Sequence, residues 1–235
     1  MLVAGFPAGA WGTNCYVLSA GPGQECIVID PGQNSIDGVS EIVREHRLRP
    51  AAVLLTHGHI DHVWCAAPLA GSHGIPAYIH PGDRYRLADP AGTSAVFDRS
   101  ALLAMTKGAL ELTEPEEVRE LPRDGAIEMA GLSLTVGHAP GHTEGSCVFI
   151  RDADGDAPPV MFSGDLLFAG SIGRTDLPGG DHAAMLRSLA GVVLPQPDEM
   201  VVLPGHGQQT TIGAERATNP FLRDLGGVAA PTRGL

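Results

Sequence analysis

One segment of the chain joins an apolar strand to a dense set of side chains that can bind metal ions. Residues 51–56 are mostly apolar and predict a buried strand, and His57, His59, Asp61 and His62 follow directly. A lone histidine is usually an ordinary core or surface residue, but this density is difficult to explain by packing. Imidazole and carboxylate groups are ligands that zinc and related divalent ions prefer. The segment therefore predicts a metal site at the end of a strand.

The spacing within this segment indicates how the ligands are shared. His57 and His59 are two residues apart, so in an extended turn they project to one side and can hold a single metal ion. Asp61 and His62 are expected to open the next helix and to point towards a second ion. Gly58 between the two histidines permits a backbone geometry that a bulkier residue would resist.

Three further apolar runs stop at small turn residues that carry one possible ligand each. Open α/β sheets place their sites at such strand ends, so these segments are expected to meet the first one. The candidate ligands are His142, Asp165 and His206, in segments 138–146, 162–165 and 203–207.

The order of expected elements predicts an α/β fold. Helical patterns over 35–48 and 181–194, the second behind an Asp181 N-cap, alternate with strands. Hairpin-like runs within 132–151 mix with crossovers, which favours an αββα sandwich of two central mixed sheets flanked by helices over a regular parallel sheet. We expect one domain over 1–235, with a helical insertion over about 90–117 near the active site and its helix at 94–109. The expected strands cover 14–19, 26–30, 51–56, 77–80, 132–136, 147–151, 160–163 and 200–203.

Composition narrows the class of partner and the location. The 235 residues carry a net charge of −12, which disfavours binding to nucleic acid. Four cysteines form no C-x-x-C pair, which excludes a zinc knuckle and favours a reducing compartment. The N-terminal run is interrupted by Gly and Pro, and no stretch approaches the ~20 apolar residues of a membrane span. We therefore expect a cytoplasmic protein with a small-molecule substrate and no membrane partner.

These motifs together resemble the metallo-β-lactamase superfamily, and within it the short bacterial glyoxalase II (hydroxyacylglutathione hydrolase)-like hydrolases. The pattern T-H-x-H-x-D-H is matched at 56–62, P-G-H-T at 140–143, G-D at 164–165 and P-G-H at 204–206. The G-R-T-D run at 173–176 is similar as well. The resemblance implies a first metal held by His57, His59 and His142, a second held by Asp61, His62 and His206, and Asp165 as the bridge between them.

The resemblance also implies an activity, namely hydrolysis of a thioester such as S-lactoylglutathione or a related acyl-thiol by metal-bound hydroxide. The cofactors would be two divalent metal ions, with zinc the first choice and iron or manganese also possible. Asp61 and Asp165 are then candidate catalytic residues besides being ligands. Two divalent cations outweigh these two carboxylates and a hydroxide, so the cleft stays electropositive. Arg174 is our candidate for holding a substrate carboxylate.

Other activities of the same superfamily remain open at this point. A persulfide dioxygenase with a single iron shares most of the motifs, and another hydrolase of the superfamily is a further alternative. A β-lactamase is disfavoured because Asp165 offers a carboxylate where those enzymes use a cysteine or lack the bridge. Few residues follow His206, whereas full-length glyoxalase II enzymes carry a basic C-terminal domain that grips glutathione. Arg216 and Arg223 could substitute in part, so the thiol carrier is open.

Overall fold

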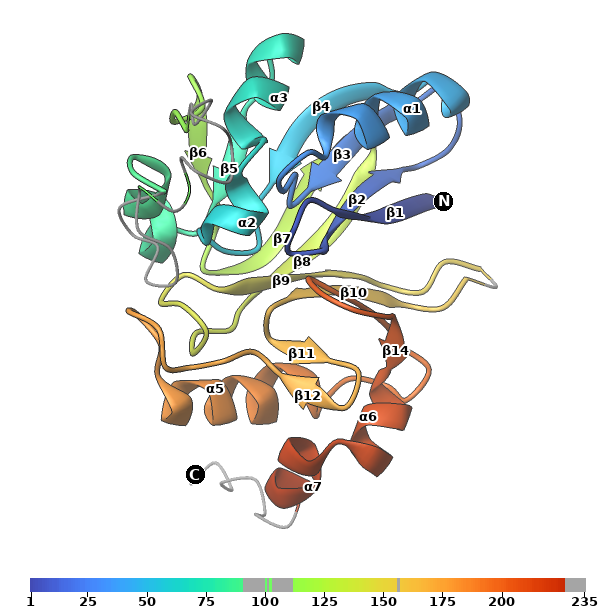
Figure 1. The fold of residues 1–235 in the computed structure, drawn as a ribbon. Coiled ribbons are helices and arrows are strands. Elements are labelled where there is room, and N and C mark those ends of the chain that lie inside the picture. The colour runs from blue at the N-terminus through green and yellow to red at the C-terminus, as the bar shows by residue number, and fades with distance from the viewer. Residues whose placement is uncertain (91–99, 101, 103–111, 156, 227–235) are drawn as a thin grey trace.

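Two six-stranded sheets lie face to face, and helices cover the outer face of each (Figure 1). This computed structural model describes residues 1–90, 100, 102, 112–155 and 157–226. The predicted αββα sandwich is confirmed. The predicted helix at 94–109 lies almost entirely outside the described residues.

The first sheet contains the N-terminal half of the strands. Its outer face carries helices α1 (Ile36–His46) and α3 (Ala66–His73), while the short helix α2 (Ile60–Val63) and the 3-10 helix η1 (Pro81–Leu87) follow strands of the same sheet. In spatial order its strands are β1 (Leu2–Ala8), β2 (Thr13–Ser19), β3 (Glu25–Ile29), β4 (Arg49–Leu54), β5 (Ala77–Ile79) and β6 (Val118–Glu120).

The second sheet contains the remaining long strands. Helices α5 (His182–Ser188), α6 (Ile212–Thr218) and α7 (Pro220–Gly226) lie on its outer side, together with the π-helical turn η2 (Leu189–Val193) and a small hairpin of β11 (Leu167–Phe168) and β12 (Ser171–Ile172). In spatial order its strands are β14 (Thr210–Thr211), β13 (Val201–Pro204), β10 (Val160–Gly164), β9 (Cys147–Arg151), β8 (Leu132–His138) and β7 (Asp124–Met129).

Side chains alternate between the two faces of the inner strands, and this alternation forms the apolar layers of the sandwich. In β2 every residue is buried, because Cys15 and Val17 pack towards the helices of the first sheet while Tyr16 and Leu18 pack between the sheets. In the second sheet β9 does the same, since Phe149 faces the first sheet. These inner strands are thus buried on both faces, which leaves their ends as the places where polar side chains can gather.

The predicted helix at 181–194 is present, and it continues into a π-helical turn. Asp181 caps it as predicted, because its side chain accepts a hydrogen bond from the Ala184 N–H at 3.0 Å. Within the part of the chain that the structure describes, no helix is both long and apolar enough to cross a membrane.

Candidate metal centre

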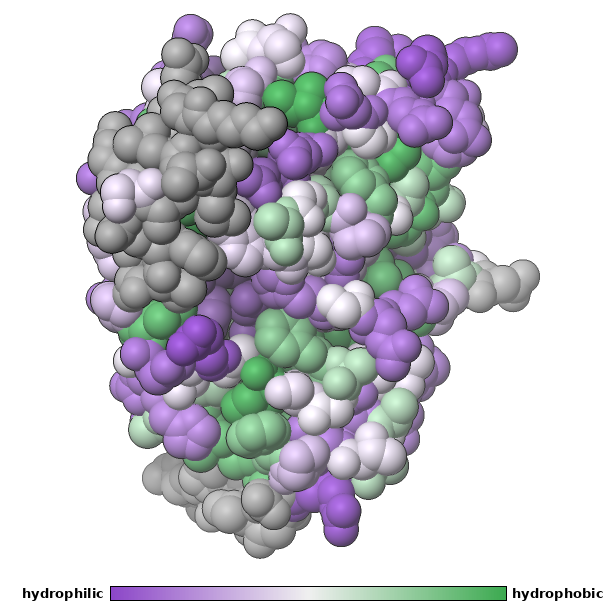
Figure 2. Space-filling view, viewed as in Figure 1, coloured by the Kyte–Doolittle hydropathy of each residue, from purple (hydrophilic) through white to green (hydrophobic). Residues whose placement is uncertain are grey.

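The seven predicted ligands gather at one end of the sandwich, near α2 and hairpin β11–β12 (Figure 1). Figure 2 shows hydrophilic surface between these elements and more hydrophobic surface over the hairpin. The ligands come from the loop after β4 (His57, His59), from α2 (Asp61, His62), and from the ends of β8, β10 and β13 (His142, Asp165, His206).

His57, His59 and His142 form the first group, and their ring nitrogens converge. His59 Nδ1 lies 3.2 Å from His57 Nε2 and 2.8 Å from His142 Nε2. His57 and His142 are buried and His59 is half-buried. The structure therefore brings together three imidazoles from two loops that are more than 80 residues apart in sequence.

Asp61, His62 and His206 form the second group. His206 Nε2 lies 3.1 Å from Asp61 Oδ2, and His62 Nε2 lies 3.4 Å from the same oxygen. The two ring nitrogens are 3.3 Å apart. Thr13 Oγ1 donates a hydrogen bond to Asp61 Oδ2 at 3.0 Å, which fixes the carboxylate from β2.

Asp165 lies between the two groups. Its Oδ1 is 3.3 Å from His62 Nε2, and its Oδ2 is 3.4 Å from His142 Nε2 and 3.7 Å from His206 Nε2. The Oδ1 atom is buried and accepts no hydrogen bond from the described residues. A buried carboxylate oxygen needs a partner, and a metal ion is one that suits its charge.

The spacing of the donor atoms fits divalent ions. Tetrahedral ligands at ~2.0–2.1 Å from zinc are about 3.3–3.4 Å from one another. The closest contacts within and between the two groups run from 2.8 to 3.7 Å, and the donor atoms of each group all lie within 4.8 Å of one another. Nitrogen and carboxylate oxygen donors at these distances suit zinc, iron or manganese, so the residues present fit a pair of such ions.

Hydrogen bonds from behind orient the histidine rings. His62 Nδ1 faces Asp30 Oδ2 at 2.9 Å, and His142 Nδ1 donates to the Arg174 carbonyl at 2.8 Å. Thr56 Oγ1 lies 3.1 Å from His57 Nδ1. Each of these contacts leaves the ring's Nε2 directed into the centre, an arrangement that metal-binding histidines usually show.

At four of the candidate ligands the surroundings also favour the ionisation state that a ligand needs. Burial lowers the pKa of His57, and it lowers the pKa of His59 to about 3, with His142 adding to the effect. Burial alone would raise the pKa of the two carboxyls, but His62 and the other nearby histidines together outweigh it, so the pKa of Asp165 falls to about 2 and that of Asp61 falls as well. Burial would also lower the pKa of His62 and His206, but Asp61 and Asp165 raise the pKa of both rings. The neutral form is thus favoured at His57 and His59 and the charged form at the two carboxyls, whereas a metal ion would have to displace a proton from His62 and His206.

Aromatic side chains lie on two sides of the centre. The Phe168 ring, in hairpin β11–β12, is 6.1 Å from the His206 ring. Trp11 and Trp64 are 5.6 Å apart and pack with Ile60, the residue between His59 and Asp61. Apolar contact surface is therefore available beside the polar ligands.

Two arginines that the sequence pointed to are engaged elsewhere. The Arg174 side chain makes two hydrogen bonds of 2.7 Å to Asp176 and is exposed, and it holds the pKa of Asp176 at about 2. Arg216 pairs with Asp198 and donates to two backbone carbonyls near the end of η2. Arg216 thus serves to fasten α6, whereas the predicted role of Arg174 stays a prediction.

Sequence reasoning missed the buried acidic residues behind the ligands. Asp30 follows β3 and accepts hydrogen bonds from the Thr56 N–H at 2.8 Å and the Thr56 hydroxyl at 2.6 Å. Asp83 lies in η1, with its side chain fully buried. Both follow apolar strands and neighbour a Pro-Gly pair, which is the same signal that marked the ligands themselves.

The fold and these donor groups define a metal-dependent hydrolase. The chain belongs to the metallo-β-lactamase superfamily, whose family profile matches residues 8–206. An uncharacterized protein of Mycobacterium tuberculosis is 46% identical, over 96% of this chain and 99% of that one. The hydroxyacylglutathione hydrolase GloC of Haemophilus influenzae is 32% identical, over 92% of this chain and 95% of GloC.

Two solved structures are similar throughout. The BLEG-1 B3 metallo-β-lactamase is 35% identical with a TM-score of 0.79, and the match covers 94% of this chain and 99% of that one. TTHA1623, solved in a di-iron-bound form, is 36% identical with a TM-score of 0.74, covering 94% and 100%. The predicted superfamily is therefore confirmed.

Proposed function

We propose that the chain hydrolyses a thioester, S-lactoylglutathione or a related acyl-thiol, with the help of two divalent metal ions. The observation that carries the proposal is the position of Asp165, whose two oxygens face the two ligand groups from between them. Zinc is our first choice, and the di-iron form of TTHA1623 makes iron the main alternative.

Two bound cations would lower the pKa of a water molecule and polarise the carbonyl that is attacked. The chain's own residues hold the reacting groups in place. Asp61 and Asp165 keep negative charge at the centre, with Asp61 fixed by Thr13. Asp30 and the Arg174 carbonyl hold His62 and His142 in one orientation. The centre is thus preorganised and does not have to rearrange during the reaction.

The leaving group favours a thioester over an amide. An amine needs a proton before it can depart, whereas a thiolate, with a thiol pKa of about 8.5, departs without one. Among the described residues, the carboxylates that contact the ligand histidines are Asp30, Asp61 and Asp165, and each is engaged with those rings. None of the three is left to act as a general acid.

Two neighbours point to substrates. GloC supports a hydroxyacyl-thiol, because its similarity extends over nearly the whole of both chains. BLEG-1 makes β-lactam hydrolysis a second candidate function.

All four cysteines are free and buried, which agrees with the cytoplasmic location that we propose.

The test is a substrate panel on protein purified without added metal, after its metals have been quantified. Thiol release is followed for S-lactoylglutathione and acyl esters of other low-molecular-weight thiols, ring opening for a chromogenic β-lactam, and oxygen uptake for a persulfide. We expect about two metal ions per chain and thioester turnover that far exceeds the other two activities. Faster β-lactam opening would establish the second candidate instead. One iron per chain with persulfide-dependent oxygen uptake would make the protein a dioxygenase.

A further inference from the structure

Asp83 joins the two loops that carry the first ligand group. Its Oδ2 accepts hydrogen bonds from the Gly58 N–H at 2.7 Å and from Thr143 Oγ1 at 2.7 Å. Its Oδ1 accepts one from the Gly145 N–H at 2.9 Å. One fully buried carboxylate therefore bonds to both loops at once.

The bonded groups lie directly beside the ligands. Gly58 stands between His57 and His59, and Thr143 follows His142. The closest ligand contact of this group, 2.8 Å between His59 and His142, spans the same two loops. Asp83 belongs neither to the two ligand groups nor to the cluster of His57, His62 and Asp165 that joins them. It therefore acts on the ligands through the backbone that carries them.

A carboxylate suits this position better than any neutral side chain. Three donors converge on two oxygens, and an amide would offer one oxygen and one N–H₂ group that faces another donor. The charge is balanced by Arg86, which is itself buried and places Nε 3.4 Å from Asp83 Oδ1. Buried ion pairs often add little net stability, so we attribute the pair of Asp83 and Arg86 to control of the geometry of the two loops.

The same arginine explains the glycine between the two histidines. A Cβ at Gly58 would lie 2.7 Å from the Cβ of Arg86, so a larger residue would push the loop away from Asp83. The backbone at Gly58 does not have a positive φ angle. The requirement here is close approach of the backbone to Arg86, which agrees with the expectation that a bulkier residue would be resisted at this position.

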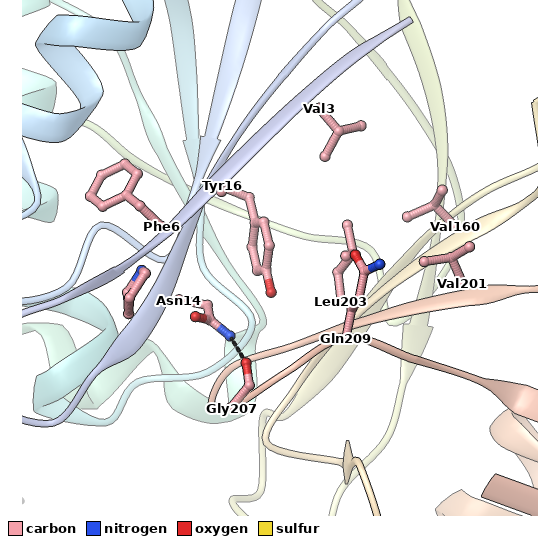
Figure 3. A pocket seen from close by; sticks show the side chains of 11 residues that line it. Val3, Phe6, Asn14, Tyr16, Val160, Val201, Leu203, Gly207 and Gln209 are labelled. Carbon is pink, nitrogen blue, oxygen red and sulfur yellow. Dashed lines mark hydrogen bonds between the residues drawn. The ribbon is translucent and has the colours of Figure 1, made fainter. Parts of the chain in front are cut away.

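The second ligand group is held by other residues. Asn14 Nδ2 donates to the carbonyls of Pro204 and Gly207, both at 2.9 Å, and so brackets His206 from β2. The Tyr16 hydroxyl donates to the Pro204 carbonyl at 2.7 Å. Figure 3 shows Asn14 directed at Gly207, beside a cavity of about 350 Å³ that the side chains of Asn14 and Tyr16 help to line. The two ligand groups thus have separate supports.

We propose that Asp83 is a positioning residue that sets the metal affinity of the His57, His59 and His142 group, while Asn14 does so for the group that contains His206. The inference rests on the metal centre of the proposed function and not on its substrate. It predicts that the affinity for each of the two ions can be lowered separately by substitutions that remove no metal ligand.

The experiment is a zinc titration of the metal-stripped full chain by calorimetry, with the histidine rings followed by NMR. In Asp83→Asn we expect the zinc affinity of one site to fall by about 10–100-fold. In the NMR titration, only the rings of His57, His59 and His142 should then need more zinc to reach saturation. In Asn14→Ala the affinity should fall at the other site, as reported by the rings of His62 and His206. Asp152→Asn, at an exposed position, is the matched control and should bind as the unaltered chain does.

Two results would overturn the proposal. One is unaltered binding at both sites in Asp83→Asn, and the other is equal weakening of both sites. If Asp83→Asn does not fold, Thr143→Val decides, because it removes one of the three hydrogen bonds and should weaken the same site less. A chain that binds two zinc ions but hydrolyses no thioester would refute the proposed substrate and leave this test intact.

Discussion

The carboxylate of Asp30 lies 2.9 Å from Nδ1 of His62, and both side chains are almost fully buried. The same oxygen accepts a hydrogen bond from the Thr56 hydroxyl at 2.6 Å. His62 can therefore present only Nε2 to Asp61 and Asp165. A residue that touches no substrate thus decides which nitrogen of a candidate ligand is available.

Replacing this carboxylate should weaken the second ligand group. Asp30→Asn replaces one of the two accepting oxygens by an N–H₂ group, which then faces either the Thr56 N–H or the two donors at the other oxygen, the Thr56 hydroxyl and His62 Nδ1. We therefore expect the affinity for the ion near His62 to fall by about 10–100-fold. The backbone should tolerate the change, since Asp30 has a φ of 48° and asparagine accepts such angles. Calorimetric titration measures the affinity, and Asp37→Asn on the exposed side of α1 is the control.

Removing the bridge should affect both ions. Asp165→Ala deletes the only carboxylate whose oxygens face both groups among the described residues, so we expect loss of tight binding at both sites and turnover lowered by at least about 10³-fold. Metal analysis after dialysis and initial rates measure these losses. A purified variant that keeps two metals and the unaltered rate would show that Asp165 is not a bridge.

Long, doubly buried strands were the predictable part of the fold. All eight expected strands are present, because a strand covered on both faces leaves a continuous apolar run in the sequence. The strands that were not predicted are short or lie at sheet edges. β1 contains Gly5 and Pro7, and β7 is largely exposed, so only their neighbours determine that they are strands.

The candidate ligands could be predicted because each follows a predicted strand. Their supports could not, since the role of Asp83 or Asn14 exists only once two distant loops meet. The sequence shows that Asp83 is an acid near a turn, and most such acids are solvated. The side-chain ion pair of Arg174 with Asp176 was likewise not predicted from the sequence, although the two residues are only two positions apart.

This pairing makes a prediction about substrate binding. Arg174→Ala should raise KM for an anionic thioester by about 10-fold with little change in kcat or metal content, because His142 is held by the backbone carbonyl of residue 174 and not by its side chain. Asp176→Asn should lower KM, since it frees the guanidinium. Steady-state kinetics distinguish the two effects. Arg187→Ala, another exposed arginine, is the control, and an unchanged KM in Arg174→Ala would assign Arg174 a structural role.

His80 should make the stability of the fold depend on pH. Burial, reinforced by electrostatic repulsion from His138, on which the ring stacks, lowers the pKa of His80 from 6.5 to about 4, with Asp83, Arg123 and Asp124 as the other charged neighbours. The neutral ring accepts a hydrogen bond from the Gly82 N–H, so it caps the helix η1 that carries Asp83.

The sign of this dependence follows from proton binding. Between about pH 6.5 and about pH 4 the unfolded chain holds a proton on His80 that the folded chain does not. The contribution of His80 to the free energy of unfolding is therefore complete above pH 6.5, and about 1–2 kcal/mol should be lost as the pH falls through this window, after solvent screening is allowed for. Urea unfolding of the unaltered chain and His80→Gln across the window measures it. The variant should show the shallower pH dependence, while the exposed control His73→Gln should follow the unaltered chain. Parallel curves for all three would show that His80 keeps an ordinary pKa in the folded protein.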